Sequence, residues 1–297
     1  MKILVTGAGG FIGSHVALRL AKEGHQIIGF DNGFTATHNQ INKVKMIKGD
    51  VTNFKEVEKA GKNCQVIVHL AGLLGTNEIA QYGQIPLANL VNINGTVNVL
   101  DLCRKNKAKH IFATKPNPQE WMNPYTITKQ SAENYCQMYS NEYKVQTIAL
   151  SLFWVYGKEQ RQEPVNKFIP TFMKYALEKK PVPIWNDGKN IIDCCYIDDI
   201  VEAFTKAVKY KIKEKFLKID VGTGIPVTIE EVAGLVNKLT GNKAGFKYIG
   251  KRLGEPYGSA LIADTSFGKR YLKFVPSITL ETGLKLCLPW FKEKFQK

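Results

Sequence analysis

The chain has 297 residues, of which 44% are hydrophobic, and it carries a formal net charge of +15. That length allows one large α/β domain or a main domain with a smaller partner, and the apolar content excludes a disordered chain. Its basic residues are mostly lysines that stand singly, whereas a nucleic-acid groove concentrates arginine and aromatic residues, so we expect a solvated basic surface and no nucleic-acid partner.

The start of the chain and its cysteines indicate a compartment. Met1 leads directly into an apolar, strand-like segment, without the charged leader and cleavage site of a secretory signal. The longest apolar run, residues 148–156, is too short to span a bilayer. We therefore expect a soluble cytoplasmic protein with no membrane partner. None of the cysteines has C-x-x-C spacing, so we expect buried thiols and no metal site.

Strand-like and helix-like segments alternate along the first half of the chain. The strand-like segments are apolar and β-branched, and the segments between them carry apolar residues at helical spacing. This alternation implies right-handed βαβ units, and near-continuous apolar strands fit a sheet covered on both faces. The predicted fold class is α/β, a Rossmann-type doubly wound parallel sheet. The expected strands cover residues 2–7, 25–32, 45–51, 65–72, 108–114, 145–157 and 215–222, and the expected helices lie within 14–24, 94–106, 168–180, 191–210 and 228–241.

A glycine-rich turn, TGAGGFIGS (6–14), follows the first expected strand and opens the first helix. Glycine permits the tight turn and lets the backbone approach a pyrophosphate, and the helix N-terminus offers N–H groups to the phosphates. The second expected strand ends in Asp31, where a carboxylate accepts hydrogen bonds from the adenosine ribose and repels a 2′-phosphate. The pattern therefore predicts NAD as the cofactor, with an ordinary turn residue as the alternative for Asp31. The glycines of the turn are Gly7, Gly10 and Gly13.

Motifs spread over nearly the whole chain resemble one family. TGAGGFIG (6–13), HLAG (69–72), NINGTVNVL (92–100), PYTITKQSAE (124–133) and KRLGEP (251–256) are similar to signatures of the extended short-chain dehydrogenase/reductases. Within that family, the chain resembles the NAD-dependent epimerase/dehydratase group, which includes enzymes like UDP-glucose 4-epimerase. It implies NAD-dependent chemistry on a nucleotide-sugar substrate. It also implies further cofactor contacts from Phe11, Ile12, Asn32, Asp50, Val51, Leu70, Ala71, Gly72 and Asn92.

Tyr125 and Lys129 stand four residues apart at the start of an expected helix, so both side chains lie on one face. An ammonium near a phenol stabilises the phenolate, and such a tyrosine can take a proton from a sugar hydroxyl while NAD accepts the hydride. Tyr175 and Lys179 share the spacing, but no strand and cofactor turn precede them, and we expect a solvated helix face there. Position after the fifth strand favours Tyr125 and Lys129 as catalytic and cofactor-binding residues, with a structural tyrosine as the alternative.

The segment between the fifth strand and Tyr125 departs from the family pattern. The family carries a serine-rich turn there, one hydroxyl of which bonds the substrate, and a loop of about double this length before the tyrosine. Thr114 is the hydroxyl left at the strand end, and Lys115 falls at the expected position. Either Thr114 polarises the substrate hydroxyl, or Lys115 donates to the substrate oxygen or points to solvent.

Two positions that would touch the substrate also differ from the family. Trp154 replaces an asparagine and could stack on a base or sugar ring or belong to the core. Ile192 replaces an arginine that grips the nucleotide phosphate, a role that an aliphatic side chain does not fill. Arg252 remains at the other phosphate position of the family, and Arg161 and Lys158 are possible substitutes. The expected substrate-binding residues are Lys115, Trp154 and Arg252.

These observations predict a two-part enzyme that epimerises a nucleotide sugar by transient oxidation of a sugar carbon. C4 is the carbon that we expect to be oxidised. The NAD-binding domain is expected over residues 1–157 with a return segment at about 193–222, and the substrate-binding part over 158–192 and 223–297. A dehydratase needs an added acid–base pair near the shortened loop, where Glu120 is the one acid, so a sugar-nucleotide reductase is the nearer alternative. The other alternative is a non-catalytic NAD-binding protein with a degenerate substrate site. The resemblance also implies a homodimer formed through a four-helix bundle.

Overall fold

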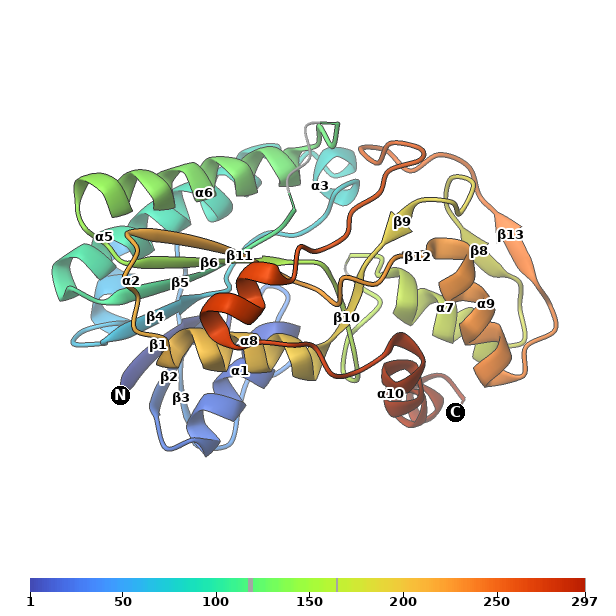
Figure 1. Ribbon diagram of the computed structural model, residues 1–297, viewed down its shortest axis with the longest axis horizontal. Helices are drawn as coiled ribbons and strands as arrows, with labels where there is room; N and C mark the ends of the chain where they lie inside the picture. The colour runs from blue at the N-terminus through green and yellow to red at the C-terminus, as the bar shows by residue number, and fades with distance from the viewer. Residues whose placement is uncertain (117–119, 164, 297) are drawn as a thin grey trace.

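A seven-stranded parallel sheet forms the centre of the larger half of the molecule (Figure 1). The structure, a computed structural model, describes residues 1–116, 120–163 and 165–296. The strand order β11-β6-β5-β4-β1-β2-β3 makes β1 and β4 neighbours. From this pair, successive strands of the chain are added outwards in opposite directions, β2 and β3 on one side and β5, β6 and β11 on the other. This order confirms the doubly wound fold, in which ligands bind at the carboxyl edge beside the reversal. The strands are β1 (Lys2–Thr6), β2 (Gln26–Asp31), β3 (Val44–Lys48), β4 (Val66–His69), β5 (Lys109–Thr114), β6 (Thr147–Leu152) and β11 (Phe216–Val221).

Helices cover both faces of this sheet (Figure 1). On one face α1 packs against α8, and on the other α5 packs against α2 and α6. Strand side chains alternate between the faces, so Ile3 and Val5 enter one apolar core and Leu4 the other. The sheet is therefore buried on both sides, as its apolar strands predict. The helices are α1 (Phe11–Lys22), α2 (Phe54–Ala60), α5 (Gly95–Asn106), α6 (Pro124–Glu142) and α8 (Ile197–Lys209).

The apolar run predicted as one strand over residues 145–157 is divided between two sheets. After Phe153 the chain leaves β6 and forms β7 (Trp154–Tyr156), which pairs with β10 (Cys194–Tyr196). Phe153 still donates its N–H to the carbonyl of Val221, the last residue of β11, at 3.1 Å. Both strands that flank β6 end here, β5 at Thr114 and β11 at Val221, so the central sheet offers no further partner strand among the described residues and the prediction of a single strand is wrong. The division carries the chain from the sheet into the smaller part.

The remaining elements form a smaller part at the other end of the molecule (Figure 1). Its short sheets pair β8 with β13 and β9 with β12. Helix α9 (Ile229–Thr240) confirms the helix predicted over 228–241, because Thr228 and Glu231 form a capping box at its start and Gly241 has a left-handed φ of 64° at its end. The other elements of the chain are α3 (Glu78–Gln81), α4 (Ile85–Ala88), η1 (Asn89–Asn94), α7 (Phe168–Leu177), β8 (Val182–Ile184), β9 (Ile191–Ile192), β12 (Val227–Thr228), β13 (Phe246–Tyr248), η2 (Gly268–Leu272) and α10 (Leu280–Phe295).

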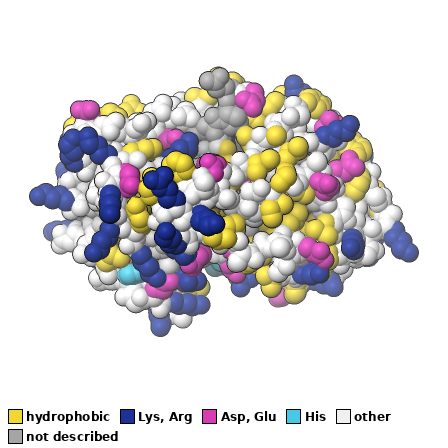
Figure 2. All heavy atoms as spheres, in the orientation of Figure 1, with side chains coloured by type: hydrophobic (Ala, Val, Ile, Leu, Met, Phe, Trp, Pro, Cys, Tyr) yellow, Lys and Arg dark blue, Asp and Glu magenta, His cyan; other side chains and the backbone are white. Residues whose placement is uncertain are grey.

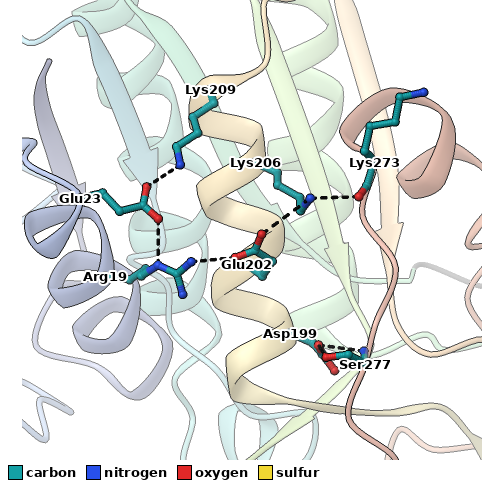
Figure 3. A network of polar contacts seen from close by, with 8 residues as sticks. All are labelled: Arg19, Glu23, Asp199, Glu202, Lys206, Lys209, Lys273 and Ser277. Atoms are coloured by element: carbon teal, nitrogen blue, oxygen red, sulfur yellow. Dashed lines mark hydrogen bonds and ion pairs between the residues drawn. The ribbon is translucent and has the colours of Figure 1, made fainter.

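Charged side chains are spread over the surface. Figure 2 shows Lys and Arg as separate groups with carboxylates between them, more of them over the half that holds the central sheet. Figure 3 shows one cluster, in which Arg19 of α1 pairs with Glu23 at 2.8 Å and with Glu202 of α8 at 3.0 Å. Lys209 of α8 pairs with Glu23 at 2.8 Å. The cluster ties α1 to α8 on the outside of their packed face.

All six cysteines are buried free thiols, as their spacing predicts. Within residues 1–116, 120–163 and 165–296, no helix combines the length and the apolar character needed to cross a bilayer. The same part of the chain holds no group of His, Cys, Asp and Glu side chains arranged to bind a metal ion.

Candidate active site

A cavity of about 720 Å³ lies at the carboxyl edge of the central sheet, where the ends of β1, β2, β4, β5 and β6 meet segments of the smaller part. It is lined by the predicted glycine turn and by the predicted catalytic pair. Of all the predicted site residues, Asn92 alone does not line it. The predicted residues on its wall are Gly7, Gly10, Phe11, Ile12, Gly13, Asp31, Asn32, Asp50, Val51, Leu70, Ala71, Gly72, Thr114, Lys115, Tyr125, Lys129, Trp154 and Arg252.

The glycine turn forms a backbone wall of this cavity. Gly7 has a left-handed φ of 68°, and a Cβ there would stand 2.6 Å from the Ala71 nitrogen. A Cβ on Gly13 would collide with the Gly7 carbonyl, so the third glycine lets α1 pack closely on the turn. Gly10 precedes α1 with extended backbone and no side-chain cap. The first N–H groups of the helix are therefore available to a phosphate.

Asp31 ends β2 with its carboxylate held beside the glycine turn. Its two oxygens accept hydrogen bonds from the Gly9 N–H at 2.9 Å and the Gly33 N–H at 2.8 Å. Asn32 donates its side-chain amide to Asp50 at 2.9 Å, which joins the ends of the second and third strands. The turn and these side chains fit NAD, with Asp31 as the group that would bond the adenosine ribose.

Asn92 lies behind the cavity wall. Its side chain is 2% exposed, and its amide exchanges two hydrogen bonds with the backbone of Leu73, at 2.7 and 3.0 Å. It also donates to the Thr128 hydroxyl on α6 at 3.0 Å. Asn92 thus fastens the segment after β4 to α6, and its direct contact with the cofactor stays a prediction.

Tyr125 and Lys129 lie on the first two turns of α6, and both face the cavity. The helix begins there because Asn123 accepts the Thr126 N–H at 2.9 Å and Pro124 occupies the first helical position. This start lies just beyond β5, so the pair is brought to the carboxyl edge of the sheet beside the glycine turn.

Burial acts on both members of this pair. It raises the pKa of the Tyr125 phenol above its ordinary value and lowers the pKa of the Lys129 ammonium to about 8. The Lys129 ammonium donates to the Ala113 carbonyl at 2.6 Å and lies 4.1 Å from the centroid of the Phe112 ring. No hydrogen bond joins it to the Tyr125 hydroxyl in the part of the chain that the structure describes.

The second pair with the same spacing is arranged differently. Helix α7 ends at Leu177, and Lys179 lies beyond it with a left-handed φ of 58°. The Lys179 ammonium donates to the Thr240 carbonyl at 2.7 Å, at the end of α9. Tyr175 and Lys179 therefore do not share a helix face, and neither lines the cavity.

Thr114 ends β5 with its hydroxyl bonded to a buried carboxylate. It donates to Glu133 at 2.9 Å, and Lys218 of β11 donates to the other oxygen of Glu133 at 2.7 Å. Thr114 and Glu133 are both buried. Because the Thr114 proton is directed to Glu133, the lone pairs of its oxygen are what it can offer to a donor in the cavity. Glu133 belongs to the matched PYTITKQSAE motif, but it was not predicted as a site residue.

Lys115 folds back towards α6. Its ammonium donates to the carbonyl of Pro116 and to the Thr126 hydroxyl at 3.1 Å, and lies 5.7 Å from the centroid of the Trp121 ring. Burial and the charge of Lys129 lower the pKa of Lys115 to about 8. Lys115 is half-buried in the cavity wall, so the alternative that it points to solvent is wrong.

Two segments that depart from the family pattern contact each other through tryptophan side chains. Trp121 comes from the shortened loop and Trp154 from β7, and their rings stand edge to face with centroids 6.1 Å apart. Both line the cavity. Trp121 is 5% exposed, and its indole N–H has no acceptor among the described residues. Trp154 was predicted as a site residue and Trp121 was not, because a single aromatic residue in a short loop matches no motif.

Arg252 lies in the cavity wall between two acids. Its guanidinium pairs with Glu255 at 3.2 Å and with Glu78 at 3.5 Å. Lys167, also in the wall, has its pKa lowered to about 8 by burial and by the charge of Arg252. Ile192 is buried in β9 and brings no charge here. Neither Lys167 nor Glu255 was predicted as a site residue, although Glu255 belongs to the same matched motif, KRLGEP (251–256), as Arg252.

The two possible substitutes for the missing arginine are placed differently. Arg161 lines the cavity and donates to the carbonyls of Ala36 at 3.4 Å and Thr37 at 3.2 Å. Lys158 is exposed and does not line the cavity.

A dinucleotide turn, a carboxylate ending the second strand and a Tyr–Lys pair after the fifth strand together define a nicotinamide-dependent enzyme of the doubly wound class. Residues 3–221 match the model of the NAD dependent epimerase/dehydratase family. The chain belongs to this family, and it is an NAD-dependent enzyme.

Relatives match the chain over nearly its whole length. A UDP-glucuronate 4-epimerase of Thermodesulfobacterium geofontis is 29% identical, with 99% of this chain and 97% of that protein covered. A UDP-N-acetyl-alpha-D-glucosaminuronate decarboxylase of Bacillus cytotoxicus is 28% identical, with 98% of each covered. The crystal structure of a UDP-glucose 4-epimerase with UDP-glucose from Thermotoga maritima is similar at a TM-score of 0.91 and 26% identity, with 99% of each chain covered.

Proposed function

We propose that this chain is a nucleotide-sugar epimerase that inverts a sugar carbon, C4, by transient oxidation. The observation that supports the proposal is a single cavity lined by the glycine turn and Asp31 and also by Tyr125 and Lys129. Bound NAD supplies a reversible hydride acceptor there. The residues of the chain hold the sugar, take the hydroxyl proton, retain the ketone while it turns and return the proton.

Tyr125 is the group that takes and returns the proton. A buried phenol with a raised pKa is a poor base unless positive charge lies nearby. Lys129 lies one helical turn further along α6, and with a pKa of about 8 its amine is mostly protonated near neutral pH. Its charge, together with that of the oxidised nicotinamide, favours the phenolate that the reaction needs.

Thr114 positions the sugar through its oxygen. Donation of its proton to the reacting oxygen would break the bond to Glu133, which is charge-assisted because Glu133 is paired with Lys218. Its lone pairs are free to accept a hydrogen bond from a sugar hydroxyl beside the reacting carbon. In this scheme the Tyr125 hydroxyl, once protonated, is the donor to the ketone oxygen.

The cavity wall from the smaller part is proposed to hold the nucleotide. Lys167 and Arg252 are the cations placed there, and Trp154 offers a ring surface beside them. The diphosphate would compete with Glu78 and Glu255 for Arg252, because a guanidinium binds a phosphate and a carboxylate through the same fork. A cavity walled by both parts of the chain supports the division into an NAD-binding domain, residues 1–157 and about 193–222, and a substrate-binding part.

The test is turnover of a panel of UDP-, GDP- and TDP-linked sugars, with products separated by anion-exchange chromatography and their configuration read by NMR. We expect one epimer pair to interconvert without net consumption of NAD. Tyr125→Phe should lose activity, whereas Tyr175→Phe, which keeps the Tyr125 site intact, should retain it. Net oxidation of NADH would indicate a reductase, loss of water a dehydratase, and no product from any sugar a non-catalytic protein; each would overturn the proposal.

We also propose a homodimer formed through α6 and the neighbouring η1 and α5. Ile127, Tyr135 and Met138 of α6 are exposed apolar residues at spacings that place them on one face, and Leu90 of η1, which packs beside α6, is exposed as well. Burial of such a face against a second copy removes apolar surface from water. Met138→Glu should shift the sedimentation coefficient to that of a monomer, while Leu286→Glu on α10 should not. A monomeric wild-type protein would contradict the proposal.

A further inference from the structure

Two ammonium groups stand beside the first turns of α6 without a carboxylate partner. Lys115 donates only to neutral acceptors, Pro116 and Thr126, and Lys129 donates to the Ala113 carbonyl. Neither forms an ion pair within the described residues. Residues 117–119, which lie outside the described residues, are Asn, Pro and Gln, and Glu120, the acid of this loop, is exposed and does not line the cavity.

The Glu133 carboxylate on α6 does not balance these charges. Glu133 is already paired with Lys218 at 2.7 Å and accepts the Thr114 proton with its other oxygen. Lys115, Lys129 and Lys218 therefore surround one carboxylate, which leaves an excess of positive charge. In the proposed mechanism the Tyr125 phenolate offsets the charge of Lys129, which leaves the Lys115 ammonium without a counter-ion, and an anionic group on the ligand would supply one.

The cluster around Arg252 in the cavity wall has no such excess. Arg252 is paired with both Glu78 and Glu255, and Lys167 lies beside them. The two cations and two carboxylates of that cluster balance one another. The cation excess therefore belongs to the lysines beside α6 and not to the Arg252 cluster that the proposed nucleotide contacts use. Arg161 also lines the cavity without an ion pair among the described residues, but it donates to the carbonyls of Ala36 and Thr37.

Neutral donors accompany Lys115. An ammonium has three N–H bonds, and two of those on Lys115 are used. Trp121, whose ring lies beside this ammonium, is buried in the cavity wall with its indole N–H unpaired among the described residues. A carboxylate can accept hydrogen bonds from both because each of its oxygens has two lone-pair directions.

We propose that the sugar of the substrate is a uronate and that Lys115 is the counter-ion of its carboxylate, with the Trp121 N–H as a second donor. This inference rests on the proposed function and names the substrate class for the same site. A neutral hexose would leave Lys115 unpaired in a partly buried position, so specificity arises from the cost of binding without the ion pair. Lys115 then takes no part in proton transfer, which remains with Tyr125.

The experiment compares steady-state kinetics of the full chain with UDP-glucuronate and with UDP-glucose. If neither UDP sugar is turned over, the same comparison of uronate and neutral sugar is made with GDP- and TDP-linked sugars. We expect kcat/KM of the wild type to favour the uronate. Lys115→Met should lower kcat/KM for the uronate by roughly a hundredfold, mainly through KM, and should change that for the neutral sugar by less than about threefold. Lys115→Arg should restore part of the loss. Lys167→Met is the matched control, because it removes a cavity lysine from the Arg252 cluster proposed to hold the nucleotide and should affect both sugars alike.

Circular dichroism of each variant shows whether it has folded, and Lys115→Gln replaces the methionine variant if that protein does not. Binding of UDP-glucuronate to Tyr125→Phe, with and without the Lys115 change, measures affinity apart from turnover. Equal loss for both sugars in Lys115→Met, or a wild type that prefers the neutral sugar, overturns the inference while leaving the epimerase proposal intact. Absence of turnover with every nucleotide sugar instead overturns the proposed function itself.

Discussion

The Thr114 hydroxyl donates to Glu133 at 2.9 Å, and this bond joins the end of β5 to the inner face of α6. Lys218 of β11 pairs with the same carboxylate at 2.7 Å. Three elements from distant parts of the chain thus fix one hydroxyl at the edge of the cavity. In the proposed function, the direction of this hydrogen bond leaves Thr114 as an acceptor towards the substrate.

Thr114→Val should therefore raise KM by about tenfold, the equivalent of one hydrogen bond, and leave kcat nearly unchanged. Thr114→Ser should behave like the wild type because it keeps the hydroxyl and its bond to Glu133. Steady-state kinetics with the substrate found in the panel measures both. A loss confined to kcat would mean instead that Thr114 polarises the reacting oxygen.

The glycine turn predicts a sharp difference between two neighbouring substitutions. Gly13→Ala places a Cβ against the Gly7 carbonyl, whereas Gly10→Ala places one 3.3 Å from the same oxygen. We expect Gly13→Ala to abolish NAD binding and to lower the thermal midpoint, because backbone cannot move aside as a flexible side chain does. Gly10→Ala should weaken binding only modestly. Isothermal titration with NAD and thermal unfolding measure the two effects, and equal affinities would contradict the role assigned to Gly13.

Lys109 gives the stability of the fold a predictable dependence on pH. Its ammonium donates to the carbonyls of Ala207 at 3.0 Å and Tyr210 at 2.9 Å, near the end of α8. Burial lowers its pKa from 10.5 to about 8. Between these values the unfolded chain binds more protons than the native one, so the free energy of unfolding rises with pH and this gain is lost as the pH falls towards 8.

Relative to Lys109→Met, the wild type should therefore gain up to about 1.4 kcal/mol per pH unit from about pH 8 to about pH 10. Urea denaturation of both proteins across this range gives the difference. Lys22→Met, which removes an exposed lysine of α1, should show no such trend. A difference that stays constant or falls with pH would contradict the burial argument.

Glu202 and Asp199 lie on the same helix, α8, and Figure 3 shows the different partners of their carboxylates. Glu202 pairs with Arg19 on the surface, whereas Asp199 is 4% exposed and accepts hydrogen bonds from the Ser277 N–H and hydroxyl and from the Ile278 N–H, each at 3.0 Å. Glu202→Gln should cost less than about 1 kcal/mol of unfolding free energy, and less still in high salt.

Asp199→Ala should cost about 3 kcal/mol, because it leaves three donors without their acceptor. Urea denaturation at low and high salt measures both variants. A loss for Asp199→Ala as small as that for Glu202→Gln would show that water reaches Ser277 and Ile278 and satisfies them.

Local pattern was enough to predict the fold and the position of the Tyr125–Lys129 pair at the cavity. Strand–helix alternation and the glycine turn fix backbone conformation over a few residues, and parallel connections bring the ends of the strands to one edge. Tyr125 and Lys129 follow β5, so their location follows from the topology. The spacing alone does not give it, since Tyr175 and Lys179 share that spacing and lie elsewhere.

The tertiary structure decided which partner each side chain finds. Thr114 bonds Glu133, Trp121 meets Trp154, and Lys115 turns towards Thr126, and each of these contacts depends on how separate elements pack. The break of residues 145–157 into β6 and β7 depends likewise on a partner strand far along the chain. A sequence records the spacing of neighbours along the backbone, whereas burial, charge balance and hydrogen-bond direction are set by residues that only the folded chain brings together.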